Sequence, residues 1–309
     1  MRRVVVSSLS LLGMGPGAGR NRRVIERTAD WIDRASRDEP DLVVLPESVN
    51  GLGLEPREWA LSAEEVPGPF TEMVSSRASE HFTYVVCPIV RRDGEGVHNS
   101  AIFYDRSGNP VSCYDKVHPT IGEMEQGILP GESGVVAEVD FGRVGFAICF
   151  DLNFPDLREY YRRGRPDIIV FPSMYRGGIQ LRLWAYEIGC FVVSATPGEQ
   201  SQIVGPLGRV MAESYNYDRI ISREVNLDYE ILHLDYNSDK FDAIKEKYGT
   251  RVRIEVASPE GIFALYSQDE CPASREIVEE FSMETREDYF KRAEMIRGER
   301  IQPQRSHPI

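Results

Sequence analysis

The sequence predicts an α/β fold in which two β-sheets pack against each other and helices cover them from outside. Short apolar segments rich in β-branched residues alternate with longer segments of helical character. Turns that contain glycine and proline join several of the short segments as hairpins, so the sheets are of mixed type. The predicted strands are many for a chain of 309 residues, which favours two packed sheets over one.

The first elements are a strand and a helix. The strand covers Arg3 to Leu9, and a helical stripe that includes Val24 and Trp31 runs from about Asn21 to Ser36. The glycine-rich segment between them, 13–19, has neither a Gly-Lys-Ser/Thr sequence nor the Gly-x-Gly-x-x-Gly order. We therefore interpret it as a flexible surface loop and not as a phosphate-binding loop.

Further strands follow along the rest of the chain. They are predicted at 42–45, 84–90, 100–104, 111–114, 135–139, 144–149, 168–171, 191–195, 201–204 and 220–225. Hairpin turns are expected at 107–110, 141–143 and 206–209.

Two of these strands lie in segments of similar sequence. Pro40–Pro46 and Pro166–Pro172 each hold a wholly apolar strand that stops at a proline, as expected of strands buried on both faces. Either they are counterparts in the two halves of a sandwich, which would place Glu47 and Ser173 at equivalent strand ends, or the likeness is a coincidence between two buried strands.

The composition excludes several classes of function. A net charge of -13 and a pI near 5.0 repel phosphate backbones and acidic membrane surfaces, and the isolated arginine pairs form no basic patch. No apolar segment is long enough to span a bilayer, and the segment after Met1 becomes polar too early for a secretory signal. We expect a soluble cytoplasmic protein without nucleic-acid or membrane partners.

The five cysteines are widely spaced, and no two of them form a Cys-x-x-Cys pair. An odd number at this spacing argues against both a disulfide framework and a zinc knuckle. No cluster of His, Asp and Cys has the spacing of metal ligands either. We therefore expect reduced thiols and no metal.

Three candidates for chemistry follow predicted strands: Glu47, Lys116 and Cys149. Strand ends hold side chains rigidly at the open edge of a sheet. Taken singly, each also fits a structural role, as a surface carboxylate, a surface lysine and a core thiol. Cys149 is the most suggestive, because the apolar segment before it gives way abruptly to Phe150-Asp151 and places the sulfur at a boundary where a thiolate can react.

The segments around these residues resemble the three signatures of the nitrilase superfamily of carbon-nitrogen hydrolases. They are Leu45-Pro46-Glu47, Tyr114-Asp115-Lys116-Val117-His118 and Ile148-Cys149-Phe150-Asp151, the last followed by Phe154-Pro155-Asp156-Leu157-Arg158. Their order and spacing both fit, and the resemblance runs from Arg3 to about Leu265. It implies a four-layer α-β-β-α sandwich, with 1–270 as the hydrolase domain and 271–309 as a C-terminal extension.

The resemblance also implies a Glu-Lys-Cys triad. Glu47 is then the base that takes the thiol proton and the acid that later protonates the leaving amine. Lys116 and the backbone amide of Phe150 stabilise the oxyanion, and Cys149 carries the acyl group as a thioester. No step of this chemistry requires a cofactor or a metal.

Many members of the superfamily use an additional glutamate between the lysine and a Pro-Gly turn, which here is the segment 122–131. The spacing of this segment differs from the commonest pattern, so Glu123 and Glu125 are both candidates, with Glu123 preferred. Both also fit the role of exposed loop acids. His118 invites a Cys-His pair, but the family pattern makes it a structural neighbour that helps to set the loop.

The residues after the nucleophile bear on the substrate. Nitrilases proper usually carry Cys-Trp-Glu, whereas the segment 149–151 resembles the amidase and carbamoylase branches. We therefore expect a small amide or N-carbamoyl substrate. By the resemblance, the pocket walls include Tyr175, Arg176, Trp184 and Thr196, and Arg176 either pairs with a substrate carboxylate or is an exposed loop arginine.

The C-terminal extension is polar and charged. Thr285 fits a helix cap, and Tyr289, Ala293 and Ile296 share one helical face. We expect that face to dock on a partner subunit, so that the protein is a homo-oligomer, and we expect 302–309 to be frayed.

Other functions stay open on the sequence alone. One is a nitrilase, and another is an acyltransferase that passes the thioester to an amine. A third, from a different class, is a catalytically silent scaffold or binding protein. The complete set of Glu47, Lys116 and Cys149 argues against silence, because a binding module has no reason to keep all three.

Overall fold

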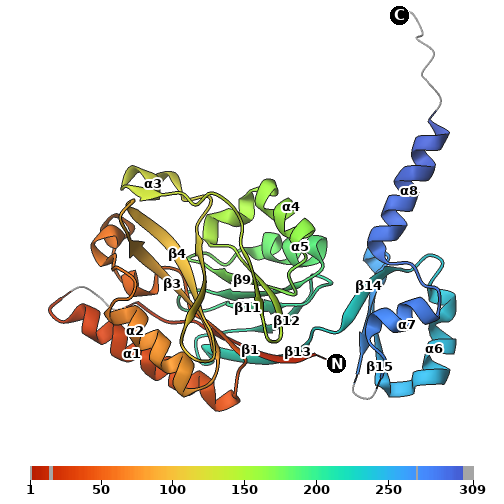
Figure 1. The fold of residues 1–309 in the computed structure, drawn as a ribbon, viewed down its shortest axis with the longest axis horizontal. Helices are drawn as coiled ribbons and strands as arrows, with labels where there is room; N and C mark the ends of the chain where they lie inside the picture. The colour runs from red at the N-terminus through yellow and green to blue at the C-terminus, as the bar shows by residue number, and fades with distance from the viewer. Residues whose placement is uncertain (1, 14–16, 269–270, 302–309) are drawn as a thin grey trace, which may run out of the picture. The chain divides into compact units, whose positions relative to one another are not determined.

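The computed structural model describes residues 2–13, 17–268 and 271–301, and the chain divides into two compact units (Figure 1). The larger unit spans Arg3–Val225, and the smaller begins at Asn226. The units thus divide before residue 270, where we placed the end of the hydrolase domain from the extent of the resemblance. That boundary stays a prediction. The segments 14–16, within the predicted glycine-rich loop, and 302–309 lie outside the described residues.

The first sheet of the larger unit is parallel at its centre and antiparallel on one side. Its strands run in the order β13 (Ile220–Asn226), β1 (Arg3–Leu9), β2 (Leu42–Val44), β3 (Tyr84–Arg92), β4 (Val97–Tyr104) and β5 (Pro110–Asp115), and β6 (Ile128–Leu129) pairs with β4. β2 lies parallel to both neighbours, with Val43 opposite Ser7 and Val85. A strand paired on both sides and covered on both faces carries only apolar residues, as β2 does.

The second sheet repeats this plan. Its strands run in the order β12 (Val210–Glu213), β11 (Gln202–Val204), β10 (Phe191–Ala195), β9 (Ile168–Pro172), β8 (Gly142–Phe146) and β7 (Val136–Val139). β9 is parallel to β8 and to β10, and all five of its residues are buried. The two segments of similar sequence therefore supply a central parallel strand to each sheet.

The two sheets face each other, and helices cover their outer faces (Figure 1). The rings of Phe103 on β4 and Phe146 on β8 meet edge to face at 5.5 Å, and the hydroxyl of Ser8 on β1 donates to the carbonyl oxygen of Ser194 on β10 at 2.6 Å. Helices α1 (Arg20–Ala35) and α2 (Pro69–Glu80) pack on the first sheet. Helices α4 (Pro155–Gly164) and α5 (Gly178–Ile188) pack on the second. The predicted four-layer α-β-β-α sandwich is confirmed.

The smaller unit has a core of its own. Its antiparallel sheet runs in the order β14 (Tyr229–His233), β16 (Ile262–Ser267) and β15 (Val252–Ala257). Helices α6 (Phe241–Tyr248) and α7 (Ser274–Glu280) contribute Ile244 and Ile277 to a core that includes Phe263. Helix α8 (Arg286–Arg300) begins at the predicted cap, where the Thr285 side chain accepts a hydrogen bond from the backbone N–H of Asp288 at 3.2 Å.

Short helices complete the fold. Helix α3 covers Ile121–Glu125, and 3₁₀ helices cover Ser36–Asp38, Val49–Gly51, Pro56–Ser62, Cys149–Asn153, Ser238–Lys240, Gly249–Arg251 and Ser258–Glu260. Within the described part of the chain, no helix combines the length and the apolar character that crossing a bilayer demands.

Candidate active site

Glu47 lies three residues after the end of β2, behind Leu45 and Pro46. Its side chain is 1% exposed, so each carboxylate oxygen needs a partner inside the protein. Oε1 accepts hydrogen bonds from Lys116 Nζ at 2.9 Å and from Asn99 Nδ2 at 2.8 Å. Oε2 accepts one from the backbone N–H of Met174 at 2.8 Å. These donors come from both sheets and fix the carboxylate in one orientation.

Lys116 follows β5, where its backbone N–H donates to the carbonyl oxygen of Asn99 at 2.8 Å. Its ammonium group donates to Glu47 and also to Glu123, at 2.8 Å to Oε2 and 3.1 Å to Oε1. Burial by itself lowers the pKa of Lys116, but the charges of Glu47, Cys149 and Glu123 outweigh burial and raise the pKa above its ordinary value. The lysine is therefore a permanent cation.

Glu123 reaches Lys116 because it belongs to a capping box. The Thr120 side chain accepts a hydrogen bond from the Glu123 N–H at 3.2 Å, and Glu123 Oε2 accepts one from the Thr120 N–H at 2.7 Å. Burial raises the pKa of Glu123, but Lys116 outweighs burial and leaves that pKa below its ordinary value. Glu125, the other candidate for this place, is exposed. The structure thus brings Glu123, and not Glu125, to the lysine.

The sequence predicts a strand at 144–149, but Cys149 does not lie in a strand. β8 stops at Phe146, and Cys149 begins a 3₁₀ helix with a left-handed φ of 49°. A non-glycine residue in that region is strained, and such strain recurs at functional sites. The thiol is 9% exposed. Burial, reinforced by the charge of Glu47, raises the pKa of Cys149 to about 12, although Lys116 and hydrogen bonds from Met174 and Ser173 act in the opposite direction.

The turn that carries Cys149 is held by Asp151, which has no exposed surface. Asp151 Oδ2 accepts from the Tyr114 hydroxyl at 2.6 Å and from the Ile148 N–H at 2.7 Å. Oδ1 accepts from the His118 N–H at 2.9 Å and contacts His118 Nδ1 at 3.2 Å. The hydrogen bond to Asp151 raises the pKa of His118, whose ring stacks on Phe154 at 3.8 Å. His118 is thus a partner of the turn and not of the thiol.

Phe150 lies in the first turn of this 3₁₀ helix, where N–H groups precede the first intrahelical hydrogen bond. A chain of side chains leads to it from Tyr175. The Tyr175 hydroxyl donates to Gln180 Oε1 at 3.3 Å, Gln180 Nε2 donates to Asn153 Oδ1 at 3.0 Å, and Asn153 Nδ2 donates to the Phe150 carbonyl oxygen at 2.9 Å. Burial, followed by the charges of Cys149 and Glu47, raises the pKa of Tyr175. Tyr175 therefore lies within electrostatic reach of the reacting groups.

The remaining predicted pocket residues make contacts of a different kind. Arg176 is exposed and forms an ion pair with Glu199 at 3.3 Å. Trp184 is fully buried, and its indole N–H donates to the Leu152 carbonyl oxygen at 3.1 Å. Thr196 is also buried, and its hydroxyl donates to the Glu199 carbonyl oxygen at 2.9 Å. Trp184 and Thr196 thus serve the packing and the loops of the second sheet.

Sequence reasoning missed Asn99 and the anchoring role of Asp151. Asn99 lies in β4, a strand whose residues are all buried, and a polar amide in such a strand is itself a signal because it needs partners. Asp151 was visible only as part of the third signature. The partners of these two side chains come from distant segments, so no local pattern could name them.

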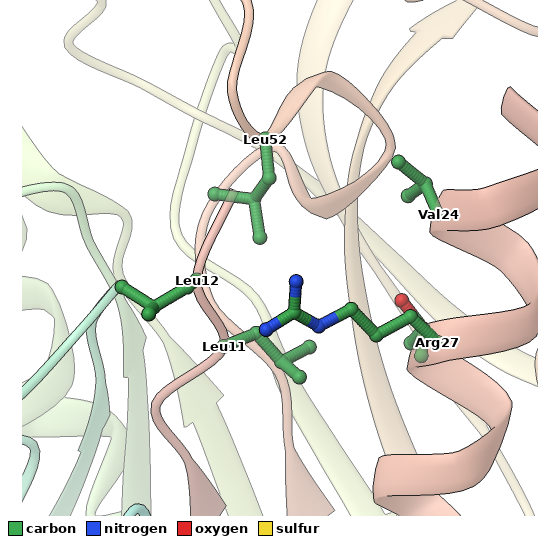
Figure 2. Close-up of a pocket in the computed structure, with 6 residues that line it drawn as sticks. Leu11, Leu12, Val24, Arg27 and Leu52 are labelled. Carbon is green, nitrogen blue, oxygen red and sulfur yellow. The ribbon is translucent and has the colours of Figure 1, made fainter. Parts of the chain in front are cut away.

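A separate pocket lies between α1 and the loop after β1 (Figure 2). Its lining is Leu11, Leu12, Val24, Arg27, Thr28 and Leu52. Figure 2 shows the Arg27 guanidinium between Leu52 and Leu11. This lining contains no acid, histidine or cysteine, and its one hydroxyl, that of Thr28, has no base beside it in the lining, so we assign the pocket no covalent chemistry. Among residues 2–13, 17–268 and 271–301, no three His, Cys, Asp or Glu side chains form a group that could hold a metal ion.

Known proteins share this fold. The crystal structure of Nit3 from Saccharomyces cerevisiae, a member of branch 10 of the nitrilase superfamily, superimposes with a TM-score of 0.66 at 22% identity, covering 80% of this chain and 95% of Nit3. An amidase from Nesterenkonia sp. gives a TM-score of 0.63 at 19% identity, covering 78% of this chain and 95% of the amidase.

Sequence comparison gives the same family. Omega-amidase NIT2 of Xenopus tropicalis is 24% identical over 231 residues, which are 66% of this chain and 83% of that protein. Omega-amidase NIT3 of Saccharomyces cerevisiae is 24% identical over 265 residues, 75% of this chain and 89% of its own length. The carbon-nitrogen hydrolase family matches residues 9–230. The chain therefore belongs to the carbon-nitrogen hydrolase family, enzymes that hydrolyse carbon–nitrogen bonds.

Proposed function

We propose that this enzyme hydrolyses small linear amides or N-carbamoyl compounds through a thioester on Cys149. The observation that carries the proposal is the buried network in which Lys116 is hydrogen-bonded to both Glu47 and Glu123, near Cys149 with its strained backbone. Such a network separates a base, a fixed cation and a nucleophile into distinct roles. Relatives named omega-amidase and amidase support the amide class.

The thiol needs a base before it can attack. With its pKa raised to about 12, Cys149 is a neutral thiol near pH 7. Lys116 is a permanent cation and cannot accept the proton. Glu47 is the acceptor, because its Oε2 shares the N–H of Met174 with the sulfur of Cys149. The proton passes to Glu47 as the sulfur attacks the carbonyl carbon and the C=O electron pair moves to oxygen.

The oxyanion that forms needs fixed positive charge. An ammonium group carries three N–H bonds. Lys116 gives one to Glu47 and shares another between the two oxygens of Glu123, which leaves one for the substrate oxygen. The N–H of Phe150 is the second donor. Glu123 keeps the lysine in place and balances its charge.

The intermediate then collapses by breaking the carbon–nitrogen bond. Glu47 returns its proton to the departing nitrogen, which leaves as ammonia or an amine, and the acyl group stays on Cys149 as a thioester. Water attacks the thioester while Glu47 takes one of its protons. Breaking the carbon–sulfur bond releases the carboxylic acid, and the proton returns to sulfur.

The ion pair between Arg176 and Glu199 bears on the kind of substrate. A free arginine would attract a carboxylate, but a glutamate already accompanies this one. A substrate carboxylate would have to displace Glu199 before it could bind. We therefore propose that uncharged amides are preferred over amides that carry a second, ionised carboxyl group.

The test is ammonia release from a panel of short amides, ureido acids, N-carbamoyl amino acids and nitriles, read together with the intact mass of the enzyme. We expect turnover of an amide or carbamoyl compound and a mass increase on Cys149 equal to its acyl group. Cys149→Ala should abolish both. Undiminished turnover in that variant, or release from nitriles alone, would refute the proposal.

We also propose that α8 carries a contact between subunits. Phe290, Met295, Ile296 and Ile301 are exposed apolar side chains on or at the end of this helix. Its first turns are held by Tyr289, stacked on His233 at 4.0 Å, and by the ion pair of Arg292 with Glu284. Four exposed apolar side chains on or beside one anchored helix support a contact with another protein surface.

A further inference from the structure

Asn99 stands at the centre of the acid–base network, although the mechanism above does not use it. The side chain lies on β4 and has no exposed surface. Its single amide nitrogen donates to Glu47 Oε1 at 2.8 Å and to Glu123 Oε1 at 2.8 Å. Asn99 thus joins the two carboxylates that flank Lys116.

The amide oxygen of Asn99 shows which hydrogen bonds fix the orientation of the side chain. Oδ1 is buried and has no hydrogen-bond partner among the described residues. An orphaned buried acceptor is costly, and side chains normally turn to avoid it. Turning the amide over would point its oxygen at two carboxylate oxygens and replace two donors by repulsion. The site therefore keeps an unsatisfied oxygen in order to give each glutamate an N–H.

The two oxygens of Glu47 consequently differ. Oε1 is occupied by Lys116 and Asn99. Oε2 receives the N–H of Met174, and that same N–H also acts on the sulfur of Cys149. Oε2 is therefore the oxygen on the side of the thiol, with a lone pair left for a proton.

We propose that Asn99 is a positioning residue that holds the carboxylates of Glu47 and Glu123 around Lys116 and so reserves Glu47 Oε2 for the proton of Cys149. This inference rests on the proposed function, since it concerns the same base. It goes beyond that function by explaining why the base faces the thiol with one defined oxygen.

The proposal predicts a shift in pH dependence. The groups that face the two glutamates are Asn99 on β4, Lys116 after β5, Cys149 in its 3₁₀ helix, Thr120 before α3, and Met174 and Tyr175 after β9. Hydrogen bonds to an ionised carboxylate favour the ionised form, so removal of the Asn99 donors makes protonation of the cluster easier. The acidic limb of the pH–rate profile of Cys149 then reflects the titration of the coupled cluster, and it moves to higher pH.

The experiment measures the rate at which iodoacetamide alkylates Cys149 between pH 4 and 9, resolved by peptide mass mapping because the other thiols are also free. This readout needs no natural substrate. In Asn99→Leu we expect the acidic limb to move upward by about one pH unit. Asn99→Asp keeps the shape but adds a third carboxylate, so its limb should move further still.

Asn50 supplies the matched control. It is also buried, but its side chain bonds backbone groups among the described residues: Nδ2 donates to the carbonyl oxygens of Ser62 and Val90, and Oδ1 accepts from the Val90 N–H. Asn50→Leu should lower the melting temperature without moving the alkylation limb. If Asn99→Leu fails to fold, an upward shift of the acidic limb in Asn99→Asp tests the same prediction.

If the acidic limb of the alkylation rate does not move in a folded Asn99 variant, the inference is wrong. It is also wrong if Asn50→Leu shifts that limb by the same amount. Failure of the proposed function looks different. In that case the unmodified enzyme releases no ammonia from any amide, while alkylation of Cys149 still depends on the cluster and still responds to Asn99.

Discussion

At the scale of single residues, the neutral thiol has the largest consequence. Many reactive cysteines are stored as thiolates, but the pKa of Cys149, raised to about 12 by burial and by Glu47, leaves the proton on sulfur until a base removes it. Reactivity should therefore follow the base and not the intrinsic acidity of the thiol.

Glu47→Gln tests this dependence. Without the base, alkylation of Cys149 should be slow at pH 7 and should rise about tenfold per pH unit toward alkaline pH, because only spontaneous ionisation supplies thiolate. The unmodified enzyme should instead reach a plateau. Loss of the Glu47 charge removes one cause of the raised pKa of Cys149, so the rise should level off below pH 12. A plateau at neutral pH in Glu47→Gln would contradict the assignment of the base.

Lys116→Met tests the charge balance. The change leaves Glu47 and Glu123 buried without their cation, which should cost about 3–5 kcal/mol of unfolding free energy at pH 7. The sign of the pH dependence should also reverse. In the unmodified protein the lowered pKa of Glu123 adds stability that is lost as pH falls. In the variant one carboxyl must take up a proton on folding, so stability is present in acid and is lost as pH rises.

Urea unfolding from pH 4 to 8 measures both effects. Lys240→Met is a control, since that ammonium donates to the Ser282 carbonyl oxygen at the surface and not to a buried carboxylate. A Lys116→Met variant as stable as the unmodified protein at pH 7 would show that the glutamates do not depend on this cation.

The triad residues were predictable because each lies within three residues after a strand and belongs to a recognisable signature. Lys116 has a further signal, as it is the only lysine before residue 240, while arginines serve every other basic position there. The capping box from Thr120 to Glu123 also contained the answer to the choice between Glu123 and Glu125. Asn99 was beyond reach, because its role depends on two carboxylates that only the fold brings together.

At the scale of elements, the turn after β8 depends on one buried acid. Asp151 accepts hydrogen bonds from Tyr114, Ile148 and His118, and these hold the turn that contains the strained residue Cys149. Asp151→Ala should leave these donors unpaired and should lower the unfolding free energy by about 3 kcal/mol or more. Denaturant titration checks the change.

Asp156 is the matched control for Asp151. It also lies near His118, at 3.4 Å from Nε2, but its side chain is 70% exposed. Asp156→Ala should therefore change stability little. Equal losses in the two variants would show that proximity to His118, and not the hydrogen bonding of the turn, accounts for the effect.

Several strand predictions succeeded where burial gives a clear pattern, although β16, all six of whose residues are buried, was not predicted. β1 and β9 are almost wholly buried and were predicted within a residue of their bounds. β14 has one buried residue, and β15 is buried only at its two ends, so neither shows a period of two. Their pairing with β16 comes from the fold and has no local signature.

At the scale of the whole molecule, the site draws on both halves of the sandwich. β2 of the first sheet leads to Glu47, and β9 of the second leads to Met174, whose N–H meets the Glu47 carboxylate. The likeness between Pro40–Pro46 and Pro166–Pro172 therefore marked the two strands whose ends meet at the site. The sequence could indicate the pair but not the contact, because facing strands of different sheets share no backbone register.

Ile296→Glu tests the proposed assembly through α8. Ile296 is 41% exposed, so the change should leave the fold of the subunit intact while placing a charge in the contact between subunits. Sedimentation equilibrium should then give a lower mass than that of the unmodified protein. Leu61→Glu is the control, because Leu61 is 81% exposed in the larger unit. An unchanged mass in Ile296→Glu would count against the proposed contact.

Glu47 and Lys116 leave one sheet, whereas Cys149 leaves the other. The base and the nucleophile are therefore aligned only while the two sheets keep their position relative to each other, which the Phe103–Phe146 contact helps to set. A small shear along that boundary would misalign proton transfer long before any strand separates. Pressure, mild denaturant or removal of the ring of Phe103 or Phe146 should therefore abolish activity. The circular dichroism spectrum should stay that of the native protein.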